Sequence, residues 1–274
     1  MRLYISCDME GVAGVTSWEQ VDARKPHHEY TIYRRYYTQE VRAAIDGARD
    51  AGANDILVND AHGPMRNLLF DELPDDIRVI FGNRKPYSMV QDIEASFNGA
   101  FFVGYHGAIG DANAVLCHTY TPSVIYDAYL NGVRCSEATL NAGLLGYYGV
   151  PLLLVTGDRT TVEGTRRQMP WVRGAIIKES IGNFAADTIS PIAAQRLIRD
   201  TARDAIANAS TAKPLVFAPP ISLDIQLYKT EQADIVEMIP GFTRTGTRSV
   251  RFIHDDFRTV FKAFVATFRL AATI

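Results

Sequence analysis

The chain has 274 residues and a formal net charge of −3, with 47% hydrophobic and 22% charged residues. This composition is typical of a soluble globular enzyme, and the length suffices for one large domain or two small ones. The net charge removes the usual electrostatic reason for binding nucleic acid, so we expect no nucleic-acid partner. No apolar run approaches the roughly 20 residues of a membrane helix, so no membrane partner is expected either.

Cysteine usage indicates a reducing compartment. The three cysteines, Cys7, Cys117 and Cys135, are too few for a disulfide framework, and no Cys-x-x-Cys pair occurs. The amino-terminal segment lacks the long apolar core of a secretory signal and runs directly into acidic residues. We therefore expect a cytoplasmic protein.

Strands and a helix alternate at the beginning of the chain. Residues 3–7 predict a buried strand, and residues 30–51 carry apolar side chains at helical spacing. Gly52 stands where a helix C-terminal cap is expected, and a second buried strand covers residues 55–60. This succession predicts a βαβ unit and hence a parallel sheet.

The middle of the chain continues the pattern. Further strands are predicted over residues 78–81, 100–106, 114–120 and 124–130. Asn131 and Gly132 form the strongest hairpin signal in the chain. Ser136 is suited to cap a helix that closes near residue 148, and one more strand covers residues 151–156.

The last third has a different pattern. It predicts a helix over about 190–209, strands over 221–227 and 249–253, and a closing helix over 255–270. The expected fold class is α/β, with a mostly parallel central sheet flanked by helices and a smaller C-terminal α+β part. We place the metal-binding catalytic domain in residues 1–188 and the smaller part in residues 189–274.

Metal-capable side chains stand at the ends of three predicted strands. Asp8 and Glu10 follow the first strand, His62 follows the second, and His106 closes a later one. Ligands of open parallel sheets gather outside the carboxyl ends of the strands, so these side chains are predicted to converge. Glu137, in the first turn of the helix after the hairpin, is suited to reach the same place.

Carboxylates and imidazoles together suit zinc and related divalent ions. Asp8, Glu10 and Glu137 supply three negative charges, and His62 and His106 supply neutral nitrogen. Two ions need more negative charge than one, and a carboxylate can bridge them, so the set matches a two-metal hydrolase. Two Zn²⁺ ions are the expected cofactors, and Mn²⁺ or Co²⁺ also suit such a set.

Each of these signals has a simpler explanation when taken alone. An Asp-x-Glu at a strand end is most often a solvated turn, and a lone histidine after a strand is most often structural. Glu137 by itself is explained by the dipole at a helix N-terminus. The recurrence of such residues at one structural position is what favours a functional site.

Other residues are weaker candidates. Asp60 could orient a ligand histidine through its free ring nitrogen. His118 lies on the predicted strand 114–120, with Cys117 facing the opposite way, and is either packed or a base or nucleophile beside the metals. Cys117 is best explained as a small buried hydrophobe. Asp158 follows a strand and is either an edge of the site or a helix cap.

Five short motifs occur together over nearly the whole chain. They are Cys7-Asp8-Met9-Glu10-Gly11, Val58-Asn59-Asp60-Ala61-His62, Gly104-Tyr105-His106, Cys117-His118 and Glu137-Ala138-Thr139-Leu140-Asn141. In order and spacing they resemble the D-aminopeptidase family of bacterial zinc peptidases.

The resemblance implies a two-zinc site in which Asp8 bridges the ions. The ligands that would complete it are Glu10, His62, His106 and Glu137. His118 matches the position of the family's nucleophile, although a general base or a stabiliser of the developing oxyanion is physically as plausible. The resemblance also implies release of N-terminal D-residues, especially D-alanine, from short peptides. It further implies a homodecamer of two stacked rings of five around an inner chamber.

We therefore expect a two-metal aminopeptidase that acts on small peptides. A two-metal amidohydrolase acting on a γ-linked peptide or a cyclic amide is one alternative, because the metal set determines reaction type more than substrate. A phosphoesterase is another, although no strand-to-helix glycine loop for phosphate is evident. The third is a non-enzymatic, metal-stabilised oligomeric binding protein, whose zinc sites would be closed rather than open.

Overall fold

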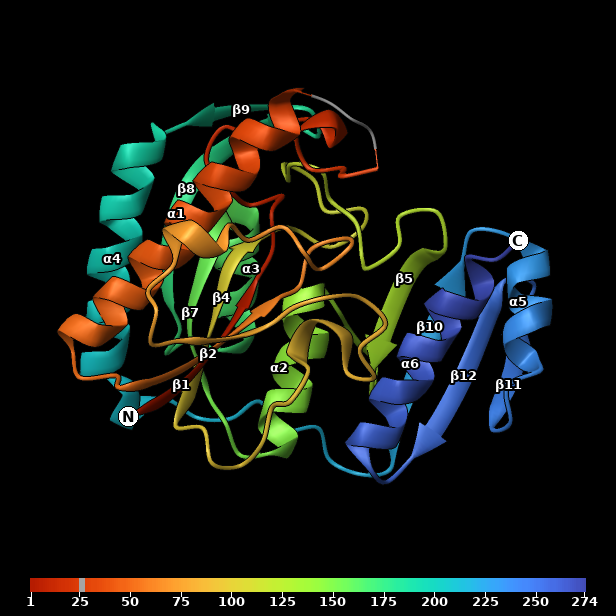
Figure 1. Cartoon of the computed structure of the whole chain (residues 1–274). Helices are drawn as coiled ribbons and strands as arrows, with labels where there is room; N and C mark the ends of the chain where they lie inside the picture. Colours follow the sequence, from red (N-terminus) through yellow and green to blue (C-terminus); the bar gives the residue numbers. More distant parts are fainter. Residues whose placement is uncertain (25–27) are drawn as a thin grey trace.

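The computed structural model describes residues 1–24 and 28–274, which form two β-sheets with helices around and between them (Figure 1). The larger sheet has the order β3 (Arg78–Ile80), β2 (Asp55–Asp60), β1 (Arg2–Cys7), β4 (Gly99–Tyr105), β7 (Leu152–Asp158), β8 (Arg173–Gly182) and β9 (Ala185–Thr188). Its strands pair in parallel, except that β9 runs antiparallel to β8. The carboxyl ends of β1, β2, β4 and β7 therefore lie along one edge.

The smaller sheet is antiparallel. Its order is β11 (Phe242–Gly246), β12 (Ser249–His254), β10 (Ile221–Leu227), β5 (Ile125–Leu130) and β6 (Val133–Arg134). β10 pairs with both β12 and β5, so the end of the chain is hydrogen-bonded to a hairpin from its middle. The hairpin turn has φ angles of 48° at Asn131 and 78° at Gly132. Positive values at both positions are those of the type I′ turn that Asn-Gly predicts.

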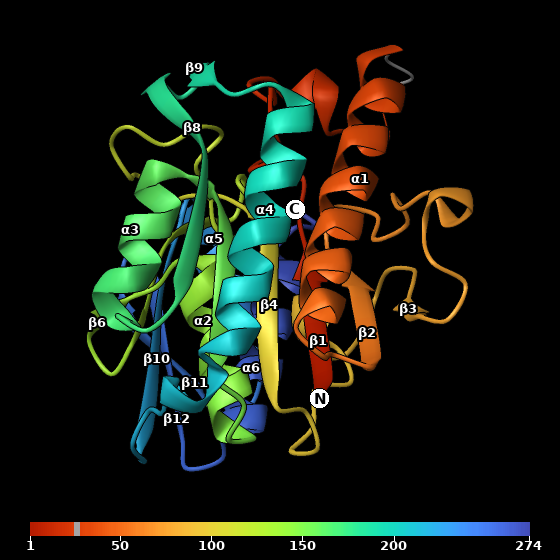
Figure 2. The ribbon, with the colours of Figure 1, turned by 90° about the vertical axis from the view of Figure 1, so that its left-hand side faces the viewer.

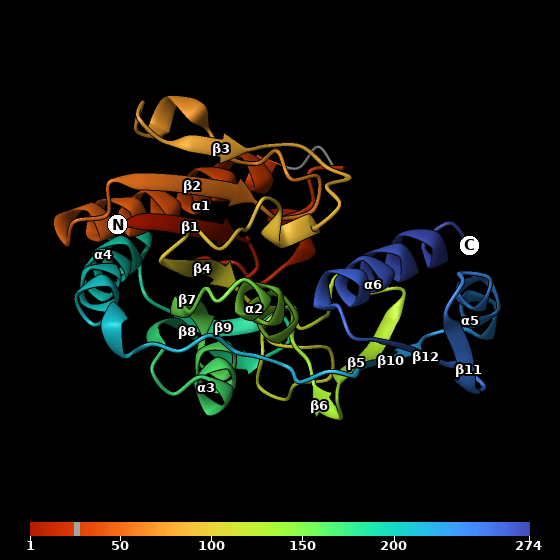
Figure 3. The ribbon, with the colours of Figure 1, turned by 90° about the horizontal axis from the view of Figure 1, so that it is seen from below.

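Six α-helices pack on these sheets in the described ranges: α1 (His28–Asp50), α2 (Glu137–Tyr147), α3 (Arg159–Gln168), α4 (Pro191–Ala207), α5 (Thr230–Glu237) and α6 (Phe257–Ala271). α1 and α4 pack together on one face of the larger sheet, where Ile5 shares a core with Val41 and Ile198. α2 and α3 cover the other face, and α6 lies between α2 and the smaller sheet (Figures 2 and 3). None of these helices is both long and apolar enough to cross a bilayer.

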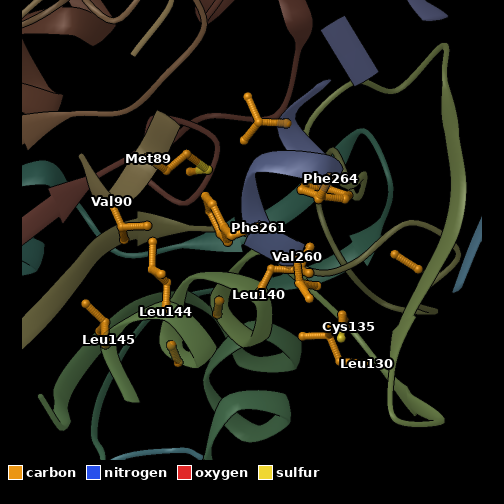
Figure 4. Close-up of a cluster of buried hydrophobic side chains, with 14 of the residues drawn as sticks. Met89, Val90, Leu130, Cys135, Leu140, Leu144, Leu145, Val260, Phe261 and Phe264 are labelled. Atoms are coloured by element: carbon orange, nitrogen blue, oxygen red, sulfur yellow. The ribbon is translucent and has the colours of Figure 1, made fainter. Parts of the chain in front are cut away.

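An apolar core joins the two sheets. Leu140 and Leu144 of α2 lie against Val260 and Phe261 of α6, and Leu130 from β5 closes the cluster (Figure 4). All five side chains are almost completely buried, and burial of apolar area contributes about 25 cal/mol per Å². This packing fixes the position of α2, the helix that begins at Glu137.

The fold class predicted from the sequence is confirmed, because a mostly parallel sheet with flanking helices is joined to a smaller unit rich in C-terminal strands. Ser136 caps α2 as predicted, since its side chain accepts a hydrogen bond from the Thr139 amide. The sequence did not predict several shorter or mixed-pattern elements: α3, β8, β9, α5 and β11.

The strand predicted over residues 114–120 is wrong. The segment is irregular, with left-handed φ angles of 48° at Leu116 and 60° at Tyr120. Two of its backbone amides form hydrogen bonds that do not belong to a β-sheet. The Leu116 amide donates to the Asn183 carbonyl at 2.9 Å, and the Cys117 amide donates to the Asn183 side chain at 3.0 Å. The apolar, β-prone composition of this run reflects burial in a loop.

The division of the chain into residues 1–188 and 189–274 stays a prediction. β5 and β6 come from the first part but belong to the smaller sheet. α4 comes from the second part but packs against α1 and β8. Elements are therefore exchanged across residue 188, and the two parts share both cores.

Two glycines let the ends of β1 and β4 approach each other. Gly104 has a φ of +74°, and a Cβ placed on it would lie 2.1 Å from the Asp8 carbonyl oxygen. A Cβ on Gly11 would lie 2.2 Å from the Tyr105 carbonyl oxygen. Since both neighbours are backbone atoms, neither clash can be relieved by a side-chain rotation.

We expect Gly104→Ala to lower the free energy of unfolding by about 2–4 kcal/mol, because it adds both left-handed strain and a backbone clash. Urea denaturation of the purified protein measures this change. Gly164→Ala is the matched control, since Gly164 lies in α3 and a Cβ there meets nothing closer than 3.5 Å. That helical substitution is expected to stabilise by up to about 1 kcal/mol. Equal effects at both positions would contradict the explanation.

Candidate metal centre

The edge formed by the carboxyl ends of β1, β2 and β4 carries the predicted site. Asp8 and Glu10 follow β1, His62 follows β2, and His106 follows β4. Glu137, the first residue of α2, joins them. All five side chains are buried, so the fold gathers three carboxylates and two imidazoles away from bulk water.

Asp8 stands between two histidines. Its Oδ1 lies 3.0 Å from His62 Nδ1, and its Oδ2 lies 3.4 Å from His106 Nε2. Glu10 Oε2 lies 3.1 Å from His62 Nδ1, and Glu137 Oε1 lies 3.3 Å from His106 Nε2. Asp8 therefore faces both histidines, one with each oxygen, and each histidine faces a second carboxylate.

Backbone carbonyls fix the tautomers of three histidines. His62 Nε2 lies 2.8 Å from the Val21 carbonyl oxygen, and His106 Nδ1 lies 2.9 Å from the Gly107 carbonyl oxygen. His118 Nδ1 lies 2.9 Å from the Leu116 carbonyl oxygen. Because a carbonyl only accepts, each of these nitrogens carries the proton and donates it. The other ring nitrogen of each neutral histidine then has a free lone pair. Metal-binding histidines are commonly held in this way, by a hydrogen bond from the ring nitrogen that does not bind the metal.

His118 lies beside the cluster, although not on a strand as predicted. Its ring stacks on His106 with centroids 4.0 Å apart and planes 8° apart. Its Nε2 lies 3.6 Å from Glu137 Oε1. The Trp18 ring packs edge-on against the His118 ring, with the ring centroids 5.3 Å apart. Cys117 is half-buried, not buried as its interpretation as a small buried hydrophobe predicted, and its amide donates to the Asn183 side chain.

The carboxylates dominate the electrostatics. Burial tends to lower the pKa of His62, but Glu10 and Asp8 outweigh it and raise that pKa well above its ordinary value. The pKa of His106 is also raised, because Glu137 and Asp8 overcome the effect of burial. The pKa of His118 is lowered by its burial and by the neighbouring His106. The cluster thus attracts positive charge, either as protons or as a cation.

The donor set fits divalent metal ions. His106 Nε2 is buried and has no hydrogen-bond partner among the described residues, although it points between Asp8 and Glu137. Ligand atoms of two overlapping groups lie within 4.8 Å of one another: Asp8, Glu10 and His106, and His106, His118 and Glu137. Buried carboxylates and imidazoles at such spacing are the ligands that zinc and similar ions use.

Asp60 acts on the segment after His62 and not on the imidazole ring. Its carboxylate accepts hydrogen bonds from the amides of Asn67 at 2.5 Å and Leu68 at 2.9 Å. The Asn67 side chain donates to Asp60 and also to the His62 carbonyl oxygen. Asp60 therefore positions His62 through the backbone.

Asp158 fulfils the capping alternative and one further function. It caps α3, since its side chain accepts from the Thr161 amide at 2.8 Å. Its other oxygen accepts from the Val115 amide at 2.8 Å, which ties down the start of the loop that carries His118. It does not line the cavity described below.

Sequence reasoning missed a buried lysine that holds the loop after β1. Lys178, on β8, donates from Nζ to the carbonyl oxygens of Glu10 at 2.6 Å, Val12 at 2.9 Å and Val15 at 2.7 Å. Burial lowers the pKa of Lys178 to about 8. Because β8 was not predicted, no local pattern indicated that this lysine reaches the loop.

The cluster opens into a cavity of about 970 Å³. Asp8, Glu10, His62, His118 and Glu137 contribute to its wall. A cavity of this size lies within the range of small-molecule sites. The metal-capable side chains are therefore accessible to a ligand from one side while remaining largely buried.

Known proteins share both the sequence and the fold. The family described as D-aminopeptidase, Peptidase M55, matches residues 1–266. A D-aminopeptidase of Bacillus subtilis (strain 168) is 34% identical over 272 residues, which cover 99% of this chain and 98% of the relative. A solved structure described as "Zn-dependent D-aminopeptidase DppA from Bacillus subtilis, a self-compartmentalizing protease" has a TM-score of 0.96 and 32% identity, covering 100% of this chain and 99% of that one. The chain therefore belongs to the D-aminopeptidase family, Peptidase M55, and is a hydrolase of the aminopeptidase class.

Proposed function

We propose that this chain is a two-zinc aminopeptidase that removes the N-terminal residue, a D-amino acid such as D-alanine, from short peptides. The observation that carries the proposal is the buried Asp8 carboxylate between His62 and His106, with His106 Nε2 left without a hydrogen-bond partner in the described chain. The similar solved structure is described as zinc-dependent, and the curated relative as a D-aminopeptidase, which supports both the metal and the substrate class.

The proposed ligand sets share Asp8. Glu10 and His62 would complete the first set, because His62 Nδ1 faces both Asp8 Oδ1 and Glu10 Oε2. His106 and Glu137 would complete the second, because His106 Nε2 faces both Glu137 and Asp8 Oδ2. Mn²⁺ or Co²⁺ could occupy the same donors, since carboxylate and imidazole ligands do not select strongly among these ions.

Bound zinc supplies Lewis-acid activation of the scissile carbonyl. The chain itself would supply amino-end selectivity, because the buried carboxylates of Asp8, Glu10 and Glu137 can accept hydrogen bonds from the substrate amine. His118 supplies a lone pair on Nε2, since its proton is on Nδ1, which donates a hydrogen bond to the Leu116 carbonyl oxygen. That tautomer has no Nε2 proton to donate to an oxyanion, so we favour a general base or a nucleophile over an oxyanion stabiliser for His118.

We also propose a homo-oligomer, a decamer by family resemblance, in the cytoplasm. The similar solved structure is described as a self-compartmentalizing protease, and the three cysteines, Cys7, Cys117 and Cys135, are free thiols. Sedimentation equilibrium is expected to give about ten times the chain mass of 30.4 kDa. A monomer or dimer at micromolar concentration would contradict the proposed decamer but would not contradict the proposed metal site.

The substrate proposal is tested by a paired assay on metal-replete protein. We expect hydrolysis of D-Ala-D-Ala but not of L-Ala-L-Ala, complete loss on chelation, and recovery when zinc is added back. Metal analysis should find roughly two ions per chain. If two ions are bound and neither peptide is cleaved, the D-alanine assignment fails, and γ-linked peptides and cyclic amides are the next substrates to assay.

The contribution of His118 is tested by His118→Ala. We expect zinc content near wild type and a fall in kcat of about 100-fold or more, because a positioned base is removed. Cys117→Ser is the matched control, since this neighbour is half-buried and is expected to keep full activity. Near-full activity of His118→Ala would remove the residue from the mechanism. A loss of one zinc ion per chain would identify it as a ligand instead.

A further inference from the structure

Two arginines line the cavity that contains the metal-capable cluster. Arg84 lies between β3 and the short helical turn at Ser88–Val90, and Arg269 lies in the last turn of α6. Arg84 has a left-handed backbone with φ of 63°, and its amide donates to the Asn83 side chain. The two residues are far apart in the sequence, and the fold brings both to the same wall.

Arg269 reaches the backbone of the segment that carries Arg84. Arg269 Nη2 lies 3.4 Å from the carbonyl oxygen of Lys85, the residue that follows Arg84. Burial lowers the pKa of Arg269, and the positive charge of Arg84 lowers it further. Like charges at close range repel each other, so this arrangement favours an anion beside the pair.

No acidic side chain in the described ranges lies within 4.0 Å of either guanidinium group. Two other arginines, one lining the same cavity and one on the same helix, have carboxylate partners. Arg24, which lines the same cavity, is paired with Asp22 at 2.9 Å, and Arg258 at the start of α6 is paired with Asp256 at 2.8 Å. Among the described residues, Arg84 and Arg269 are therefore the cavity-lining arginines that have no carboxylate partner, although Arg269 Nη2 also contacts the Lys85 carbonyl oxygen.

We propose that Arg84 and Arg269 bind the free α-carboxylate of the substrate. Arginine suits this anion, because its planar fork donates two parallel hydrogen bonds to a carboxylate. The inference rests on the proposed function, which assigns the amino end of the peptide to the metal cluster. Both groups face one cavity of about 970 Å³, so a peptide of two or three residues is the substrate class that can engage both ends.

The test compares two substrates that differ only at the carboxyl end, D-Ala-D-Ala and D-Ala-D-alaninamide, on zinc-replete protein. Wild type is expected to prefer the free carboxylate by about tenfold or more in kcat/KM, mainly through KM. Arg84→Asn and Arg269→Gln are each expected to lower kcat/KM for the free dipeptide by about tenfold. Both variants should leave kcat/KM for the amide within about twofold of wild type. Asparagine is chosen at residue 84 because it tolerates the left-handed backbone.

Lys262→Gln is the matched control. Lys262 is an exposed cation on α6 that lies over the Tyr87 ring and does not line the cavity, so neither substrate should be affected. Unfolding midpoints and zinc content of all variants establish that the fold and the cluster are intact.

The possible failures are distinguishable. Equal loss on both substrates in the arginine variants would assign them a structural role and overturn the inference. Equal cleavage of both substrates by wild type would also overturn it, while the aminopeptidase proposal would stand. Cleavage of neither substrate by protein that holds two zinc ions would overturn the proposed function and this inference with it.

Discussion

The site depends on carboxylates that are held inside the protein, where charge is costly unless it is compensated. Asp8 is the most constrained, because its two oxygens face His62 and His106 at 3.0 and 3.4 Å. Burial alone would raise the pKa of Asp8, yet the two histidines bring it well below its ordinary value. Glu137 is compensated by a hydrogen bond from the Tyr120 amide and by the positive end of the α2 dipole. Removing either kind of compensation leaves buried negative charge that only a cation can balance.

Most residues of this cluster lie in loops, and buried polar contacts fix the conformation of these loops. Lys178 donates to three carbonyl groups of the loop that carries Glu10, and Asn183 accepts hydrogen bonds from two amides of the loop that carries His118. Both anchors belong to β8 and to the turn between β8 and β9, on the far side of the sheet from β2. The parallel strands thus bring the metal-capable residues to one edge, while β8 and its hairpin determine how the two loops fold over that edge.

Local sequence signals sufficed where a residue is placed by its own strand or helix. Asp8, His62 and His106 follow strands with continuous apolar runs, and Glu137 follows a serine cap. The segment around His118 could not be predicted, because left-handed residues and distant partners override its β-prone composition. Lys178 could not be assigned, because its role depends on contacts with a loop more than 160 residues away. Such contacts follow from tertiary packing, which no window of sequence contains.

The net charge of the cavity depends on whether metal ions are bound to the cluster. Asp8, Glu10 and Glu137 carry three negative charges, whereas two divalent ions carry four positive charges, so the proposed holoenzyme has one net positive charge at this cluster. Arg84 and Arg269 add uncompensated positive charge to the same wall. A cavity with this balance attracts the carboxylate of a peptide and disfavours an ammonium group. In the proposed holoenzyme the amino end would therefore approach most readily as a neutral amine, and the proposed arginine pair would orient the peptide by its carboxylate.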